Sequence, residues 1–365
     1  MENTQSNIPR KQRLLSLDVL RGLTVAGMIL VNNGGGKVSY APLRHSVWNG
    51  LTLADLVFPF FLFMVGISTY ISLRKFEFKW SNPLALKILK RTCLILLIGW
   101  AIYWFEGCCK GDFLPFDHMR LPGVLPRIAL CYGIVSLLAV TVSHKWLPWL
   151  AGFLLVGYTF LLLVANGYVC DETNILCIVD RSVFGAAHLY HKSPIDPEGL
   201  LGVIPSIAHT LIGFWCGKIL TEHSELKDKM LHLFIFGFVL MSVGLLFTYG
   251  LPMNKRIWSP TLVLFTCGLA TSLLAWFIYV IDDKGNKGWT PFFVSFGVNP
   301  LFIYVMSELM NIVFADFGIS KALFGGIHAI VPDDYVSSLI YAVTFVLLNW
   351  AIGYPLYKKK IYIKI

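Results

Sequence analysis

Charge is the scarcest feature of this sequence. Only 14% of its 365 residues are Asp, Glu, Lys or Arg, whereas 56% are hydrophobic, which is too apolar for a soluble domain of this size. The net charge of +9 is spread over many loops instead of one face, so a nucleic-acid-binding protein has little support. CxxC and His-rich spacings are also missing, and nothing else in the sequence indicates a metal site.

The hydrophobic residues occur in long runs. A run of about 20 apolar residues spans the hydrocarbon core of a bilayer, whereas a barrel strand needs only about ten residues that alternate in polarity. The sequence therefore predicts an all-α, polytopic integral membrane protein with about ten transmembrane helices and one transmembrane domain over residues 1–365. The runs lie near 14–33, 52–73, 87–105, 124–142, 146–166, 199–220, 231–250, 259–281, 292–314 and 336–356.

The distribution of Lys and Arg predicts the orientation. Arg21 interrupts the first run and no small-x-small cleavage site follows, so we expect a retained helix and not a cleaved signal. Lys and Arg are more frequent in the loops on the side of the N-terminus, which predicts cytoplasmic termini. Residues 1–13 then form a cytoplasmic tail, and residues 167–198 form the longest loop on the opposite side. Cys170 and Cys177 in that loop are the simplest disulfide pair, but their connectivity stays open.

The stretch 16–66 concentrates groups capable of chemistry. Histidine titrates near neutral pH, so His45 can act as a general base or accept an acyl group. Asp55 can hold a ring nitrogen of His45, and the Asn32 carboxamide can stabilise an oxyanion. These groups favour acyl transfer to an amine or hydroxyl; the alternative is a solvated histidine beside a flexible glycine turn. The same loop contains Gly34, Gly35, Trp48 and Asn49.

Basic residues precede and interrupt the third and fourth predicted helices. Lys87, Lys90 and Arg91 are either a positive-inside signal or a binding site for an anionic cytosolic molecule such as a nucleotide diphosphate. Arg127 follows an irregular, proline-rich helix start. A buried arginine needs an anionic partner, which a ligand or one of the carboxylates Asp18 and Asp55 can supply.

Acidic and amide side chains mark two further places. Asp196 and Glu198 precede the sixth helix, where carboxylates suit the positive end of the helix dipole; substrate binding is the other interpretation. Asn299-Pro300 is expected to break the ninth helix and free backbone groups. Glu308 lies within the same apolar run, so we expect it to be paired, protonated or at a cavity wall.

Several motifs together resemble one family of membrane acetyltransferases. The sequence begins with RLLSLDVLRGLTVAGMILVNNGGG and continues with RHSVWNGLTLADLVFPFFLFMVG; further on it contains LPGVLPRIAL, DPEGLLGVIPSIAHTLIGFWCGKIL and PFFVSFGVNPLFIYV. These segments resemble the heparan-α-glucosaminide N-acetyltransferase family and its bacterial relatives, over most of the chain. The HxxWNGLTxADLVFP block is long and specific, whereas LDxLRG is weaker because other membrane acyltransferases carry similar starts.

The resemblance implies an activity and a set of site residues. The family moves acetyl from cytosolic acetyl-CoA to the amine of a terminal glucosamine across the membrane, and its essential histidine and loop asparagine match His45 and Asn32. Asp55 is expected to orient His45. Coenzyme-binding candidates are Arg127, which matches an arginine of the PGVLxR motif, together with Lys87, Lys90, Arg91, Gly34, Gly35 and Asn299. Substrate-binding candidates are Trp48, Asn49, Asp196, Glu198 and Glu308.

The resulting prediction is an acetyl-CoA-dependent N-acetyltransferase of a bacterial inner membrane, multi-pass, surrounded by lipid and homodimeric. Its acceptor is expected to be an amino sugar or a glycosaminoglycan-derived saccharide, and no metal is required. Two alternatives remain. One is a transporter of an amino sugar or its oligomer, with Arg127, Asn299 and Glu308 along the path; the other is an O-acetyltransferase of a cell-envelope glycan.

Overall fold

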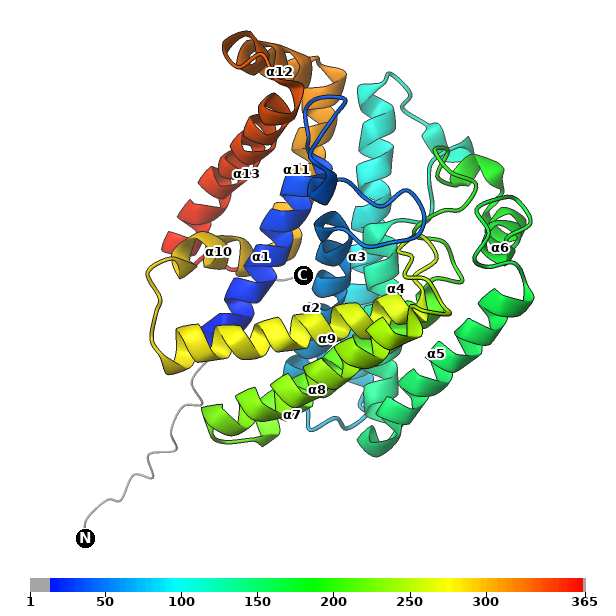
Figure 1. The fold of residues 1–365 in the computed structure, drawn as a ribbon, viewed down its shortest axis with the longest axis vertical. Coiled ribbons are helices and arrows are strands. Elements are labelled where there is room, and N and C mark those ends of the chain that lie inside the picture. The colour runs from blue at the N-terminus through cyan, green and yellow to red at the C-terminus, as the bar shows by residue number, and fades with distance from the viewer. Residues whose placement is uncertain (1–13, 364–365) are drawn as a thin grey trace.

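The protein is a bundle of helices (Figure 1). The structure, a computed structural model, describes residues 14–363, and no strand occurs in that range. Its α-helices are α1 Leu15–Asn32, α2 Leu53–Arg74, α3 Asn82–Cys109, α4 Val124–Thr141, α5 Leu147–Val164, α6 Ile175–Phe184, α7 Val203–Glu222, α8 Leu226–Phe247, α9 Pro260–Phe277, α10 Thr290–Gly297, α11 Pro300–Asp316, α12 Ile319–Ile330 and α13 Asp334–Lys358. Short helical turns are η1 Ala41–Leu43, η2 Pro115–Asp117, η3 His144–Trp146, η4 Ala186–His188 and the π-helix η5 Ile278–Asp283.

The chain is a multi-pass membrane protein. Within residues 14–363, nine helices are long and apolar enough to cross a bilayer, and the bent pair of α10 and α11 makes a tenth. The predicted all-α class with about ten transmembrane helices is therefore confirmed. The orientation of the termini stays a prediction, and the expected tail 1–13 lies outside the described residues.

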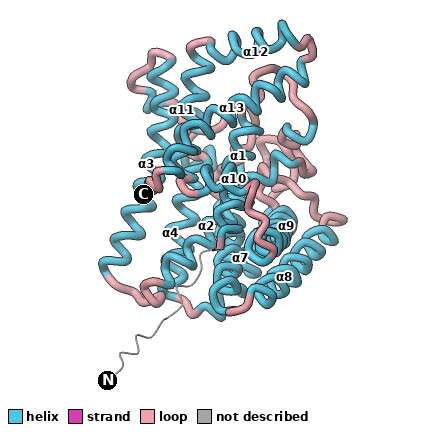
Figure 2. Tube along the Cα trace, turned by 90° about the vertical axis from the view of Figure 1, so that its left-hand side faces the viewer, coloured by secondary structure: helices cyan, strands magenta, loops and turns pink. Residues whose placement is uncertain are grey.

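Two helices of the described part were not expected from hydropathy. α6 lies within the predicted loop 167–198, and α12 crosses one end of the bundle next to the start of α13 (Figures 1 and 2). Both are shorter than a membrane span, so a search for long apolar runs does not detect them. Cys177 is buried in α6 while Cys170 is exposed, and both are free thiols.

Local signals in the sequence start several helices. Ser81, Ser259 and Asp333 each accept a hydrogen bond from a backbone N–H of the first turn of α3, α9 and α13. Such caps satisfy donors that have no partner within the helix. α3 and α9 also carry Pro in the first turn, where its missing N–H costs nothing.

The centre of the bundle is formed by α2 and α7. The apolar windows of these two helices are 67% and 72% buried inside the protein, against 17% for α3 and for α8. Side chains such as Phe234 and Phe238 point outward from α8 and are more than half exposed. An apolar outer face of this kind suits contact with lipid tails.

Glycines allow α2 and α7 to cross closely. A Cβ atom on Gly213 would lie 2.2 Å from the carbonyl oxygen of Phe63, and one on Gly66 would lie 2.2 Å from that of Thr210. Small residues at crossings let helix backbones approach within a membrane. The same device joins α1 to α10, where a Cβ atom on Gly297 would lie 2.0 Å from the Asp18 carbonyl oxygen.

The predicted break at Asn299-Pro300 is confirmed, because α10 and α11 meet at an angle of 84°. The Asn299 side chain lies at this bend and holds the end of the chain. Its Nδ2 donates to the Ile361 carbonyl oxygen at 2.8 Å, and its Oδ1 accepts from the Ile363 N–H, also at 2.8 Å. Residues 361–363 therefore already form hydrogen bonds with the Asn299 amide, which the sequence had suggested as a coenzyme-binding group.

The glycine crossing gives a first prediction. Gly213→Leu should lower the free energy of unfolding by about 3 kcal/mol or more, because the added side chain meets backbone and not a movable side chain. The apparent melting temperature of the purified protein in detergent measures this. Gly157→Leu on α5 is the matched control, since no atom lies within 4 Å of its Cβ position. Equal melting temperatures for the two variants would contradict the close packing.

Candidate active site

His45 and Asp55 form a hydrogen-bonded pair at one end of the bundle. We call this the loop end, because it carries the loop 33–52; the opposite end, where α3 begins, is the basic end. Nδ1 of His45 lies 2.9 Å from Oδ1 of Asp55. The Asp55 side chain is only 1% exposed, whereas the His45 side chain is 44% exposed. The carboxylate can therefore orient an imidazole whose outer edge is accessible, as we expected from the sequence.

Asp55 also organises the chain around it. Its Oδ2 accepts hydrogen bonds from the backbone N–H groups of Ser46 and Thr52, each at 3.1 Å. Asp55 stands in the first turn of α2, where a carboxylate bound to the N-cap N–H satisfies a donor that the helix leaves free. The start of α2 and the residue after His45 are thus tied to one carboxylate.

Trp48 and Asn49 fasten the loop to other segments. Trp48 Nε1 donates to the Tyr168 carbonyl oxygen at 2.9 Å. The Asn49 Oδ1 accepts from Nδ2 of buried Asn254 at 3.1 Å, and Gly50 N–H donates to the Met253 carbonyl oxygen at 2.8 Å. The structure thus gives both substrate-binding candidates a role in holding the loop, Trp48 against Tyr168 and Asn49 against Asn254.

That second loop brings Lys255 to the pair. Lys255 Nζ lies 3.2 Å from Nδ1 of His45, 3.5 Å from its Nε2 and 3.8 Å from Oδ1 of Asp55. Burial lowers the pKa of Lys255, and the negative charges of Asp55 and Glu198 oppose this shift. The site therefore contains a cation that no sequence motif singled out.

Arg127 lies further into the bundle, beside the fully buried Trp258. Its guanidinium carbon is 5.1 Å from the centroid of the Trp258 ring, and its Nη2 donates to the Gly199 carbonyl oxygen at 3.0 Å. Asp18, one expected partner of Arg127, forms an ion pair with Arg21 at 3.4 Å instead. The other, Asp55, accepts from His45. An indole face and a carbonyl oxygen thus replace the predicted carboxylate.

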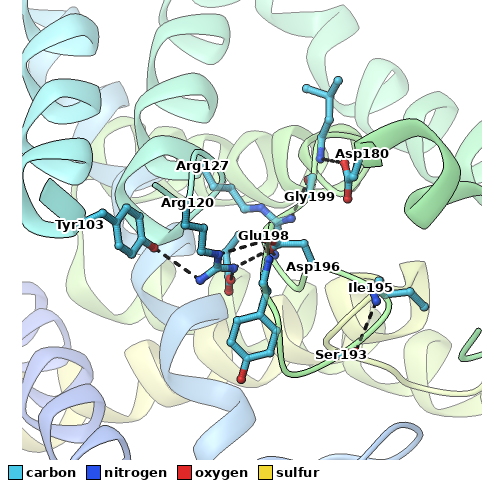
Figure 3. A network of polar contacts seen from close by, with 11 residues as sticks. Tyr103, Arg120, Arg127, Asp180, Ser193, Ile195, Asp196, Glu198 and Gly199 are labelled. Carbon is cyan, nitrogen blue, oxygen red and sulfur yellow. Dashed lines mark hydrogen bonds and ion pairs between the residues drawn. The ribbon is translucent and has the colours of Figure 1, made fainter. Parts of the chain in front are cut away.

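Arg120 is the centre of a second polar network at the loop end (Figure 3). Its Nε and Nη2 bind the two oxygens of Asp196 at 3.1 and 2.5 Å, and Nη2 binds Glu198 at 2.7 Å. Nη1 of Arg120 also donates to the Tyr103 hydroxyl at 3.5 Å. Burial alone would lower the pKa of Arg120, but these neighbours raise it. The network joins the end of α3 to the segment before α7.

The capping interpretation of Asp196 and Glu198 is wrong. α7 begins at Val203, its N-cap is Gly202, and no side chain caps it. Asp196 is fully buried and also accepts from the N–H groups of Tyr190 and Glu198, each at 2.9 Å. Both oxygens of Asp196 are therefore bound by the bidentate donor of Arg120 and by the backbone of its own segment, and not by the start of α7. Glu198, with 11% of its side chain exposed, remains closer to the surface.

Asn32 and Glu308, the two other candidates in apolar helices, contact each other. Asn32 stands at the exposed end of α1, and its side chain is hydrogen-bonded to the Glu308 carboxyl group, which also bonds to Tyr304 of α11. Glu308 acts electrostatically on Tyr103, as Glu198 does. Within the described residues no hydrogen bond joins Asn32 to His45. The two lie at the same end of the molecule in separate contacts.

A large cavity opens toward the basic end. Its volume is about 650 Å³, which is within the range of sites that hold cofactors. Lys87, Lys90 and Arg91 of α3 line it together with Asn299, so the structure gathers four of the predicted coenzyme-binding residues. Apolar side chains of α2 and α4 form much of the remaining wall; these include Phe61, Met64, Ile128 and Tyr132.

The cavity and the His45–Asp55 pair share α2. Phe61 lines the cavity and stands six residues after Asp55 in the same helix, which is about 9 Å along the helix axis. Phe58 lies between them and packs edge to face on Trp258, with ring centroids 5.0 Å apart. Along α2, apolar residues including Phe58 therefore lie between Asp55 and the first cavity residue of that helix.

The other coenzyme candidates lie elsewhere. Gly34 accepts a hydrogen bond from the Ser338 hydroxyl, and Gly35 has a positive φ of 67° and faces the Tyr341 ring. Both therefore pack on α13. Arg127 stands next to Ile128 of the cavity wall, but its guanidinium points to Gly199 and Trp258.

Comparison with known proteins gives the same family that the motifs indicated. Residues 13–251 match the model of the catalytic region of heparan-alpha-glucosaminide N-acetyltransferase. The heparan-alpha-glucosaminide N-acetyltransferases of Homo sapiens and Mus musculus are each 30% identical to this chain, over 97% of its length. The chain belongs to the heparan-alpha-glucosaminide N-acetyltransferase family. It spans about 60% of the length of each of these relatives.

The family match covers only part of the site. His45, Asp55, the basic residues of α3 and the Arg120 network fall within the matched range 13–251. Lys255, Trp258, Asn299 and Glu308 lie after it. The loop between α8 and α9 and the later helices thus add groups to the site.

Sequence reasoning missed Lys255, Arg120 and Tyr103. Lys255 and Arg120 appeared as ordinary loop cations, and Tyr103 as one aromatic residue in an apolar run. One signal was available for Lys255. The segment PMNKRIWSP places four polar residues between prolines, on the predicted side of His45.

The buried acid Asp180 gives a second prediction. Its Oδ1 accepts from the Leu200 N–H at 2.8 Å (Figure 3), and burial raises its pKa from 3.8 to about 6. The folded state keeps this proton up to about pH 6, whereas the unfolded chain releases it near pH 4. As the pH rises from about 4 to about 6, the free energy of unfolding therefore falls by up to about 3 kcal/mol.

We expect Asp180→Asn to lessen the fall in melting temperature from pH 4.5 to 7. Melting curves in detergent at several pH values measure it, with exposed Glu172→Gln as the control. If wild type and Asp180→Asn change in parallel with pH, the buried acid is not titrating as described.

Proposed function

We propose that this protein is an acetyl-CoA-dependent N-acetyltransferase acting across a membrane, with its acceptor amine on the side of the loop end. The observation that carries the proposal is the 2.9 Å pair of His45 and Asp55 one helix segment away from a cavity lined with cations. Family membership supports the reaction class. The relatives' printed name supports a glucosaminide as acceptor.

The cavity residues fit an acetyl-CoA donor. Lys87, Lys90 and Arg91 offer charges for the phosphates, because Lys and Arg form charge-assisted hydrogen bonds to phosphate oxygens. The apolar wall of Phe61, Met64 and Ile128 suits the pantetheine arm. When bound, acetyl-CoA supplies a thioester, which is an activated acetyl group.

At the loop end, the residues of the chain handle the proton of the acceptor. Asp55 holds Nδ1 of His45, which leaves Nε2, 3.5 Å from Lys255 Nζ, as the nitrogen that would take a proton from the acceptor amine or carry the acetyl group. Asn32 offers a carboxamide N–H for the developing oxyanion. Glu198, whose charge acts on Lys255, and Glu308, which contacts Asn32, offer carboxylates for hydroxyl or amine groups of a sugar. The prevalence of Lys and Arg at the basic end supports a cytoplasmic donor side, and with it a bacterial inner membrane.

A sidedness experiment tests the proposal. Purified protein is reconstituted into liposomes that contain glucosamine, and radiolabelled acetyl-CoA is added outside. Labelled N-acetylglucosamine inside the vesicles is the expected product. Acetyl-CoA binding without any acetylated sugar would agree with the proposed donor and contradict glucosamine as the acceptor. Glucosamine release without acetyl-CoA would overturn the enzyme in favour of a transporter.

His45→Ala should reduce acetyl transfer about 100- to 10,000-fold, the range for loss of a general acid–base group. Transfer to glucosamine in detergent, corrected for folded protein, measures it. His118→Ala is the matched control, because this histidine is exposed at the loop end and pairs only with Asp112. Retained activity in His45→Ala would contradict the assignment.

The cavity assignment gives a separate expectation. Lys87→Gln combined with Lys90→Gln should raise KM for acetyl-CoA about tenfold or more, because two charge-assisted contacts are lost, while kcat stays near wild type. Lys79→Gln is the control, since Lys79 is exposed on the preceding loop and pairs with Glu77. An unchanged KM in the double variant would exclude this cavity as the phosphate site.

A further inference from the structure

Lys255 is the group at the His45–Asp55 pair for which the reaction outlined above has no use. It reaches the site from the loop between α8 and α9, which contacts the loop 33–52 through Asn254 and Met253. Its side chain is 14% exposed. Burying an ammonium group beside an imidazole is costly unless its charge is paired, here with Asp55 at 3.8 Å.

One carboxylate oxygen faces two groups that can each carry a positive charge. Oδ2 of Asp55 already accepts from the N–H groups of Ser46 and Thr52 and from the Thr52 hydroxyl. Oδ1 is left for His45 at 2.9 Å and for Lys255 at 3.8 Å. A single negative charge balances only one of the two cations.

Two cations this close exclude each other. Lys255 Nζ lies 3.2 and 3.5 Å from the two ring nitrogens of His45. A like charge at such a distance disfavours the second protonation, and groups coupled this strongly titrate as a pair. When Lys255 carries the proton, His45 is uncharged, and only an uncharged imidazole can act as a base or nucleophile.

We propose that Lys255 is a positioning residue that keeps His45 unprotonated by supplying the positive charge that Asp55 would otherwise take from the imidazole. This inference rests on the proposed function for its purpose, although not for its test. Asp55 retains the hydrogen bond that orients the ring. In this proposal Lys255 acts only through its effect on His45 and does not contact the substrate.

The other charges around His45, Asp55 and Lys255 come from four segments of the chain. Burial disfavours the charged form of Lys255, and the charge of Asp55 opposes this; Glu198, before α7, also favours the charged form, whereas Arg127 of α4 and the adjacent Arg256 disfavour it. Arg44 adjoins His45 in the loop 33–52. These groups are not in direct contact with Lys255 or His45. Which of the two carries the proton is therefore decided mainly by the contacts among His45, Lys255 and Asp55.

The test measures the protonation of His45 directly. Diethyl pyrocarbonate modifies uncharged imidazole, and His45 is accessible because 44% of its side chain is exposed. The full chain in detergent is labelled briefly from pH 5 to 8, and carbethoxylation of the peptide that contains His45 is quantified by mass spectrometry. In Lys255→Met we expect the labelling midpoint to move up by about one pH unit, which is a tenfold change in proton affinity.

Two further variants make the result specific. Lys255→Arg keeps the charge and should restore the wild-type midpoint. Arg256→Met removes the neighbouring cation, which is outside the direct contacts, and should leave it unchanged. A midpoint in Lys255→Met that equals wild type or moves down overturns the inference. Melting curves of each variant show whether the fold is retained.

Kinetics separate this inference from the proposed function. If wild type transfers acetyl, the acidic limb of its kcat/KM profile should move up in Lys255→Met together with the labelling midpoint, and KM for acetyl-CoA should not change. If wild type transfers nothing, the labelling shift still decides the role of Lys255, and only the proposed function fails.

Discussion

The loop end of this protein depends on one buried carboxylate. Asp55 accepts hydrogen bonds from Ser46 and Thr52, orients His45 and attracts Lys255. A carboxylate that is 1% exposed must keep such partners, because removal of its donors would leave an uncompensated charge. Two loops that are about two hundred residues apart in sequence are therefore held together by the same group.

Close helix packing places that carboxylate in line with the cavity. α2 is among the most buried spans, and the crossing at Gly66 and Gly213 keeps it against α7. Because one helix carries Asp55 at its start and cavity residues further on, with Pro59 between them, the distance between the two sites is set within α2. Under the proposed function, the acetyl group must pass the aromatic pair of Phe58 and Trp258. Arg127 supports this pair from the α4 side.

Arg120 gives the loop end its second anchor. It holds Asp196 and Glu198 in the segment before α7, while Tyr103 links the network to the neighbourhood of Glu308. The two networks meet through Glu198, whose charge acts on Lys255. The loop end is therefore a connected set of charged groups, and each of them has a structural partner. A sugar bound there would exchange hydrogen bonds with groups that are already in position.

The sequence by itself determined the class of the protein, the spans and the chemical pair. Long apolar runs must form helices in a bilayer, because each backbone group needs a partner within its own segment; the nine or ten candidate spans within residues 14–363 agree with this. His45 and Asp55 are ten residues apart and joined by a short loop, so their contact is nearly local. The family motifs named the same residues.

Contacts between distant segments were decided only by the tertiary structure. Lys255 contacts His45 across 210 residues. Arg120 binds Asp196 and Glu198, which were expected to cap a helix. Residues 361 and 363 form hydrogen bonds with the Asn299 amide. α6 and α12 are too short for hydropathy to detect. These contacts depend on how the helices cross. Glycines permit the close crossings, and because glycine has no side chain, its type alone does not indicate which helix it packs against.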